Sequence, residues 1–347
     1  MDRFIGLDAH LSSCTMAVLG PSGKRLQTAV VETNAAALVD FVRGVRGTRR
    51  LCMEEGTMSD WLYEVLSPHV EELVVLGIPP GKKGPKSDAR DALGLANQLR
   101  LGNVELAVYK GHGAFRQLRE LSRVYTKITD DVVRVKNRLK AMYRSRGIVT
   151  SGRSVFQESC REEWLKQLPE TSRPAAEQLY AILDAVEAVK ATSQAQLVAE
   201  SHRHPISRKL ETIPGMGQVR VAQALAILVT PKRFRTKRQL WSYAGLGVVM
   251  RSSSDWVRHE ERWVRSDVSA PRGLNPRCNK QLKMIFKGAA TTAINQAPQS
   301  PLGEQYARLV AGETKPNLAK LTVARKIAAV FLALWKNEEV YDSKRRR

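Results

Sequence analysis

The chain has 347 residues, of which 56 are Lys or Arg and 34 are Asp or Glu, giving a formal net charge of +22 and a pI of about 10.1. Because 43% of the residues are hydrophobic, the chain can bury real cores, which excludes a wholly disordered basic protein. Neither an apolar run of ~20 residues nor a signal sequence is present, and the four cysteines are far apart, so a membrane span, a disulfide framework and a zinc module are not expected. A soluble, cytoplasmic protein is therefore expected, and its charge suggests a polyanionic partner, most simply nucleic acid.

The positive charge is unevenly distributed along the chain. Residues 1–109 carry 12 basic and 13 acidic residues, whereas residues 110–347 carry 44 basic and 21 acidic residues. The sequence therefore predicts a near-neutral N-terminal unit joined to a strongly basic remainder.

The first hundred residues alternate strand and helix signals. Strands are predicted at Phe4–His10, Cys14–Gly20, Gln27–Glu32, Leu51–Met53 and Leu73–Ile78, and helices at Asn34–Val45 and from Trp61. A further helix follows, so the order βββαβαβα with a hairpin start favours a ribonuclease-H-like mixed sheet. Neither a GxGxxG nor a P-loop motif follows the first strand, which argues against a dinucleotide or nucleotide triphosphate site.

A long helix is predicted after Phe115, because apolar residues recur there at alternating spacings of 3 and 4. This heptad seam consists of Leu118, Leu121, Tyr125, Ile128, Val132, Val135, Leu139 and Met142. A second helix, Pro174–Glu200, could return antiparallel through Leu179, Ile182, Val186 and Val189. Two interpretations stay open, a helical hairpin within one chain and a seam shared between subunits, and the length of the helix favours the second.

The segment Thr212–Gly217 (TIPGMG) precedes an apolar helix at Val221–Val229 and resembles the turn of a helix-hairpin-helix element. Such a turn lets backbone N–H groups approach a phosphate. Four cations follow it, namely Arg233, Arg235, Lys237 and Arg238, and favour phosphate binding. The alternative is an ordinary pair of helices joined by a glycine turn.

Four acids from separate elements could converge at one edge of the predicted sheet, since Glu54 and Glu55 cannot both point inward from a strand. Asp8 lies within the first apolar strand, where a charge is costly without a partner. Glu54 and Glu55 end a nearby strand, and Asp88 and Asp91 share one face of a helix's first turn. Taken singly, Asp88 could be an N-cap and Asp91 a charge favoured by the helix dipole. Together the acids favour a Mg²⁺ site, in which two ions about 4 Å apart would serve phosphodiester chemistry.

The motifs FIGLDAH, EEGT, KSDARDA, TIPGMG and WSYAGLG resemble, in order and spacing, the DEDD transposases of the insertion-sequence one-ten family. The resemblance implies a RuvC-like catalytic domain at residues 1–109, a basic coiled-coil region at 110–206 and a C-terminal transposase domain with a nucleophilic serine at 207–347. It also implies recombination of donor and target DNA guided by a structured bridge RNA, with Mg²⁺ as cofactor. A homo-oligomer, a dimer or a dimer of dimers, associated with the nucleoid of a prokaryotic cell, is expected.

Carried over by position, the family's acidic residues fall on Asp8, Asp88 and Asp91, and its glutamate on Glu55, with Glu54 as the alternative. Gly56 and Thr57 follow Glu55 as the family pattern requires, which is why Glu55 is preferred.

The family's serine falls on Ser253 when residues are counted from Gly245-Leu246 without gaps. Ser252 and Ser254 adjoin it, and Asp255 stands where the family has glycine, so each of the three serines remains a candidate.

The sequence thus predicts an RNA-guided DNA recombinase that works through a phosphoserine intermediate. Two alternatives remain open: a RuvC-like structure-specific nuclease that uses metal-activated water, and a nucleic-acid-binding protein without catalytic activity. A nuclease would still cleave DNA after Ser253→Ala, and a binding protein would tolerate loss of the aspartates.

Overall fold

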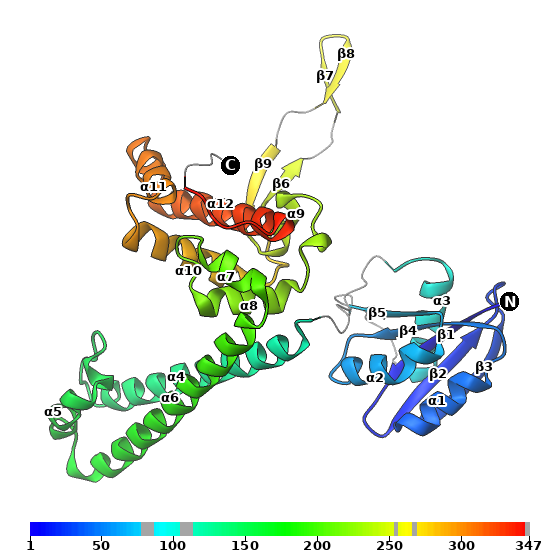
Figure 1. Cartoon of the computed structure of the whole chain (residues 1–347), viewed down its shortest axis with the longest axis horizontal. Helices are drawn as coiled ribbons and strands as arrows, with labels where there is room; N and C mark the ends of the chain where they lie inside the picture. The colour runs from blue at the N-terminus through cyan, green and yellow to red at the C-terminus, as the bar shows by residue number, and fades with distance from the viewer. Residues whose placement is uncertain (78–86, 105–113, 253–255, 266–268, 344–347) are drawn as a thin grey trace. The chain divides into compact units, whose positions relative to one another are not determined.

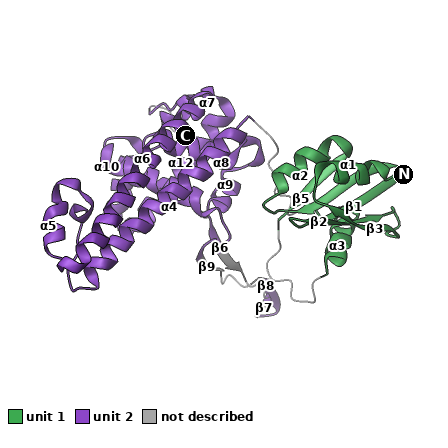
Figure 2. Cartoon of the chain, turned by 90° about the horizontal axis from the view of Figure 1, so that it is seen from below, with its two compact units in different colours: residues 1–111 green, residues 112–347 purple. Residues whose placement is uncertain are grey.

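The computed structural model describes residues 1–77, 87–104, 114–252, 256–265 and 269–343. Ile78, Ser253 and Ser254 lie outside these ranges. The chain divides into two compact units, residues 1–111 and 112–347 (Figure 2). The three-part division into 1–109, 110–206 and 207–347 stays a prediction.

Unit 1 is built on one five-stranded mixed sheet (Figure 1). Its strands are β1 Asp2–Ala9, β2 Ser13–Leu19, β3 Arg25–Glu32, β4 Thr48–Glu54 and β5 Glu72–Leu76. They lie in the order β3-β2-β1-β4-β5, with β1, β2 and β3 antiparallel and with β4 and β5 parallel to β1. The predicted succession of strands and helices, including the opening hairpin, is confirmed.

Helices cover both faces of this sheet. Helices α1 (Ala35–Gly44) and α2 (Ser59–Leu66) pack on one face, where Ile5 and Leu7 are fully buried. Helix α3 (Asp88–Arg100) packs on the other face, against Phe4 and Cys52. Successive side chains of β1 therefore alternate between the two cores, as the pleat of a strand requires. Asn34, the first residue of the predicted helix, caps α1 by accepting a hydrogen bond from the N–H of Ala37 at 2.8 Å.

Unit 2 begins with a helical hairpin of α4 (Arg116–Arg144) and α6 (Arg173–His202), which lie side by side (Figure 1), with α5 (Arg161–Lys166) between them in sequence. The predicted seam of α4 is buried or half-buried within this same chain. Of the two interpretations that the heptads left open, the structure shows the intramolecular hairpin, and a contact between subunits through the half-buried part of the seam stays a prediction.

The apolar face predicted for α6 was partly wrong. Ile182 and Val189 are 45% and 54% exposed, whereas Leu179 and Val186 are half-buried. The buried face instead uses Ala176, Tyr180, Leu183 and Leu197. Tyr180 fits there because its hydroxyl donates to the carbonyl of Val155 at 2.9 Å and lies 3.1 Å from the hydroxyl of Tyr143.

The rest of unit 2 is mostly helical, as predicted. Its helices are α7 Pro205–Glu211, α8 Gln218–Leu228, α9 Lys237–Tyr243, α10 Lys280–Gln296, α11 Pro301–Ala311 and α12 Pro316–Asn337. Its strands form two short antiparallel pairs, β6 Val248–Ser252 with β9 Ser269–Leu274, and β7 Trp256–His259 with β8 Arg262–Arg265. None of the helices in the described ranges is long and apolar enough to cross a membrane.

The predicted glycine turn joins α7 to α8. Gly215 has a φ of +83°, and a Cβ on it would lie 2.1 Å from the carbonyl oxygen of Ala289 in α10. Packing against α10 therefore requires this glycine, whatever the turn binds. Gly217 precedes α8 with open space where its Cβ would be, so the N-terminus of α8 stays accessible.

Candidate metal centre

The centre lies at the C-terminal end of β1 in unit 1. Asp8 is the penultimate residue of β1, two residues after Gly6, so both point to the face that carries α3. A Cβ on Gly6 would lie 1.8 Å from the carbonyl oxygen of Ala92, which shows how closely α3 approaches β1. Because Asp88 begins α3 one turn before Ala92, this packing brings the two aspartates together.

Ser87, not Asp88, occupies the N-cap position of α3. Asp88 is the first helical residue, and its side chain is 59% exposed, compared with 20% for Asp8. Asp88 is therefore not the N-cap that it could have been, although Ser87 makes no side-chain capping hydrogen bond, and the carboxylate of Asp88 lies in the cluster.

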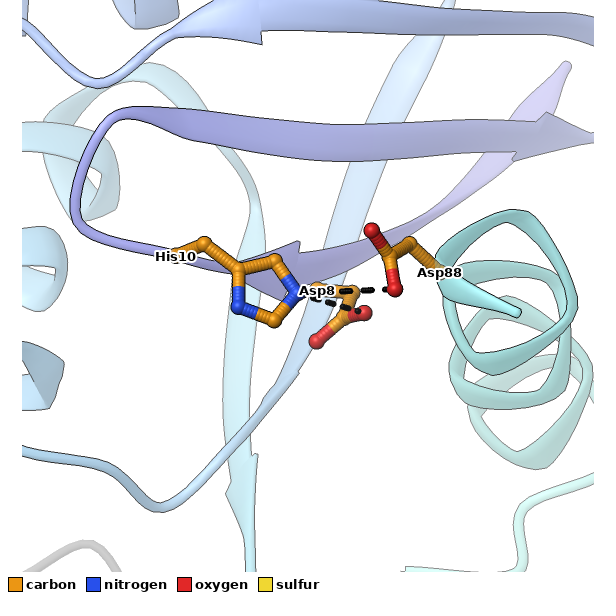
Figure 3. Close-up of side chains that lie close together, drawn as sticks. All are labelled: Asp8, His10 and Asp88. Atoms are coloured by element: carbon orange, nitrogen blue, oxygen red, sulfur yellow. Dashed lines mark ion pairs between the residues drawn. The ribbon is translucent and has the colours of Figure 1, made fainter. Parts of the chain in front are cut away.

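Asp8, Asp88 and His10 form a cluster of three possible metal ligands (Figure 3). The Nε2 atom of His10 lies 3.5 Å from Oδ2 of Asp8 and 3.6 Å from Oδ1 of Asp88. One donor atom from each side chain lies within 4.8 Å of the others. Two carboxylates and an imidazole so close together suit a divalent cation.

Burial is the main reason why the pKa of Asp8 is raised above its ordinary value. The charge of His10 and its hydrogen bond oppose this shift, whereas the negative charges of Asp88 and Asp91 add to it. A bound cation would relieve the repulsion among these carboxylates, so the electrostatics fit a metal site.

His10 was not among the site residues predicted from the sequence. It follows the end of β1 and is 55% exposed, so neither apolar periodicity nor burial marks it. The spacing Asp-x-His could have indicated it, because residues two apart in an extended segment place their side chains on the same side, here those of Asp8 and His10.

Comparison with known proteins identifies the family. A model described as a transposase, for the DEDD transposases of IS110, matches residues 5–145. A second model, described as the transposase IS116/IS110/IS902 family, matches residues 207–307, so the two together cover more than half of the chain. The chain belongs to the IS110 family of transposases.

A relative of this IS110-family chain is the insertion element IS110 uncharacterized 43.6 kDa protein of Streptomyces coelicolor. The two are 32% identical over 163 residues, which are 47% of this chain. The match spans 36% of the relative's own length.

In this IS110-family chain, the register of parallel strands β1 and β4 places the two candidate glutamates differently with respect to Asp8. Leu7 pairs with Met53, so Asp8 and Glu54 lie next to each other and on the same face. The charge of Glu54 adds to burial in raising the pKa of the Cys52 thiol, which packs against α3. Glu54 therefore lies on the α3 face, whereas Glu55 follows the end of β4.

The structure brings together only some of the predicted acids. Asp8 and Asp88 are in the cluster, and Asp91 acts on Asp8 through its charge. Among the described residues, neither Glu54 nor Glu55 belongs to the cluster of donors within 4.8 Å.

In unit 2, the segment that leads to the predicted serine is anchored to α12. The indole N–H of Trp241 donates to the carbonyl of Arg325 at 2.8 Å, and Nε of Arg325 donates to the carbonyl of Leu246 at 2.7 Å. Strand β6 follows and ends at Ser252, whose backbone pairs with Ser269. The four cations that the sequence analysis linked to phosphate binding precede this segment in the chain and are exposed, namely Arg233, Arg235, Lys237 and Arg238.

Proposed function

We propose that this IS110-family chain is a DNA transposase that cuts donor and target DNA and rejoins the strands. The observation that carries the proposal is the cluster of Asp8, His10 and Asp88 in a chain of this family. A transposase must activate phosphodiester bonds, and grouped carboxylates are the usual means of placing divalent cations on them.

We further assign unit 1 to the RuvC-like, ribonuclease-H-like fold. The strand order β3-β2-β1-β4-β5 with an antiparallel opening supports this assignment. Asp8 on the central strand and Asp88 on the helix that covers it would then be the principal ligands.

The cation that we propose is Mg²⁺, because the ligands are mainly hard oxygen donors. Asp8, Asp88 and Asp91 would hold it, together with a glutamate. The register of β1 and β4 favours Glu54 for that position over Glu55. When bound, the ion would polarise the phosphate and offset charge that develops in the transition state.

We propose that Ser253 is the nucleophile, on the basis of its match to the family motif. Its Oγ would form a bond to phosphorus, and the bond from phosphorus to the 3′ oxygen would break, leaving a 3′ hydroxyl once that oxygen takes a proton. The DNA strand would stay linked to the protein as a phosphoserine ester, which conserves the bond for rejoining.

A structured bridge RNA that guides target choice, and an assembly of two or four subunits, complete the proposal. Both rest on the resemblance, together with the large positive charge after residue 109, which would suit RNA as well as DNA. Acids of one subunit and the serine of another would make cleavage depend on assembly.

The test uses the full chain purified with its copurifying RNA. It is incubated with donor and target DNA and Mg²⁺, and covalent peptide–DNA adducts are mapped by mass spectrometry. We expect an adduct on Ser253 that is lost in Ser253→Ala, in Asp8→Asn and on chelation of Mg²⁺. Asp40→Asn, an exposed acid on α1 of the same unit, should keep the adduct.

Each contrary outcome points to a different correction. An adduct on Ser252 or Ser254 would move the nucleophile, and cleavage without any adduct would indicate a nuclease. Unchanged biological activity in both Asp8→Asn and Asp88→Asn would show that the aspartates are not catalytic and would favour a nucleic-acid-binding protein without catalytic activity. Comparison of Glu54→Gln with Glu55→Gln identifies the glutamate ligand, since only one of them should lose activity.

A further inference from the structure

Strands β7 and β8 form a two-stranded ribbon (yellow in Figure 1) that pairs with no other strand in the described parts of the chain. His259 pairs with Arg262, so the loop is only Glu260-Glu261, and Glu260 has a φ of +54°. A two-residue loop whose first residue has a positive φ is typical of the tight turns that join adjacent antiparallel strands. The ribbon is therefore a tight hairpin with two open faces.

One face of this hairpin carries both of its tryptophans. Trp256 and Arg258 lie two residues apart on β7, and Arg258 pairs with Trp263 on β8. Because residues two apart on a strand, and paired residues of neighbouring strands, share a face, all three lie together. Val264 lies on the opposite face. We call the three residues Trp256, Arg258 and Trp263 the aromatic face.

The aromatic face has no cover within the described chain. Trp256 is 59% exposed and Trp263 is 65% exposed. A two-stranded hairpin has no core of its own and is marginally stable in water, so large exposed indoles are costly there. Such a face is expected where a ligand covers the rings.

The chemistry of the face selects the ligand. Indole rings and the planar guanidinium group both stack on nucleobases. The chain after residue 109 has 44 basic against 21 acidic residues, which attracts a polyanion. Bases inside a duplex are already stacked on both sides, so only unpaired bases can lie on these rings.

The position in the sequence indicates which bases these are. Trp256 follows Ser253 by three residues. If Ser253 attacks DNA, as the proposed function holds, the nucleotides that reach the hairpin are those beside the cleaved bond. We propose that the aromatic face stacks on unpaired bases of single-stranded DNA next to the cleavage site.

The test measures binding of the full chain to a fluorescein-labelled 20-nucleotide single strand and to a duplex of the same sequence by anisotropy. Base stacking on an aromatic side chain commonly accounts for a factor of ~5 to 150 in affinity per base. We expect Trp256→Ala/Trp263→Ala to weaken single-strand binding at least ~10-fold while duplex binding changes less than ~2-fold. Val264→Ala, on the opposite face, is the matched control and should leave both affinities unchanged.

Two further measurements separate stacking from loss of structure. Trp256→Phe/Trp263→Phe keeps aromatic rings and should restore most of the single-strand affinity. 2-Aminopurine placed in the strand beside the cleaved bond should lose fluorescence on binding the wild-type chain and keep it with the alanine variant.

The outcomes distinguish this inference from the proposed function. Equal weakening of single-strand and duplex binding, unchanged affinity in the alanine variant, or tighter binding of the same sequence as RNA would overturn the inference. Failure of the wild-type chain to form any Ser-linked DNA adduct would overturn the proposed function instead.

Discussion

Gly6→Ala adds one methyl group to β1 at a point where no ligand would bind, yet we expect it to disrupt the candidate metal centre. The new Cβ would lie 1.8 Å from the carbonyl oxygen of Ala92 and 2.6 Å from the amide nitrogen of Ala96. Both are backbone atoms of α3, so no side chain can turn away to make room.

The size of the effect follows from these distances. Ordinary contacts begin at 3.4 Å, so α3 would have to retreat from β1 by about 1.5 Å. Overpacking of this kind costs about 3 kcal/mol or more when the backbone must move. Asp88 begins the same helix, so its carboxylate would move away from Asp8, and a displacement near 1 Å costs on the order of 100-fold in rate.

Hydrogen exchange and strand transfer are the two assays. Exchange of β1 and α3 peptides in the full chain should accelerate in Gly6→Ala, and strand transfer should fall about 100-fold. Gly94→Ala is the matched control on α3, because nothing lies within 4 Å of its Cβ position and alanine stabilises a helix by about 0.5–1 kcal/mol. Unchanged exchange and activity in Gly6→Ala would refute the close packing of α3 on β1 as the basis of the site.

Three further variants test other contacts. Burial, followed by the charges of neighbouring glutamates, raises the pKa of the Cys52 thiol to about 12, from 9.0 in the unfolded chain. Between these two pH values the folded state keeps the proton that the unfolded state has lost, so the free energy of unfolding of unit 1 should fall by about 1.4 kcal/mol per pH unit. Urea denaturation at a series of pH values measures this slope, which should be absent in Cys52→Ala. Tyr180→Phe leaves the buried carbonyl of Val155 without its donor and should cost about 1–3 kcal/mol in unit 2, measured by urea denaturation. Gly215→Ala meets the carbonyl oxygen of Ala289 at 2.1 Å in a left-handed backbone and should lower the melting temperature of unit 2, and an unchanged melting temperature would contradict the packing of this turn.

Local patterns were sufficient to predict most of unit 1. Its strands are short apolar runs separated by turn residues, and these signals depend only on neighbours in sequence. Asp8 was detectable for a similar reason, because a carboxylate inside an apolar strand needs a partner. His10 was missed because its contact with Asp88 arises only after α3 has packed across β1, and the spacing Asp-x-His by itself did not mark it as a site residue.

The helical hairpin of unit 2 illustrates what a heptad pattern leaves open. The seam of α4 shows that an apolar stripe must be covered, and this was predicted correctly. The pattern does not identify the covering surface. Helix α6 of the same chain covers Val132, Val135 and Leu139, whereas Leu118 and Tyr125 pack in the larger core to which α8 also contributes. The face of α6 was misjudged because Ala176 and Tyr180 pack there, while the larger aliphatic side chains Ile182 and Val189 remain exposed.

The choice between Glu54 and Glu55 depends on which face of the sheet α3 covers, and a single sequence does not show this. Neighbouring residues of a strand point to opposite faces, so the identity of the ligand depends on which face α3 covers. Gly6 and Cys52 pair across β1 and β4, and both face α3. Two residues further along, the same parity brings Asp8 and Glu54 to that face. The family motif instead favoured Glu55, because the motif is matched by the types of residue that follow the glutamate. Where each carboxylate lies is determined by the pairing of β1 with β4 and by the packing of α3.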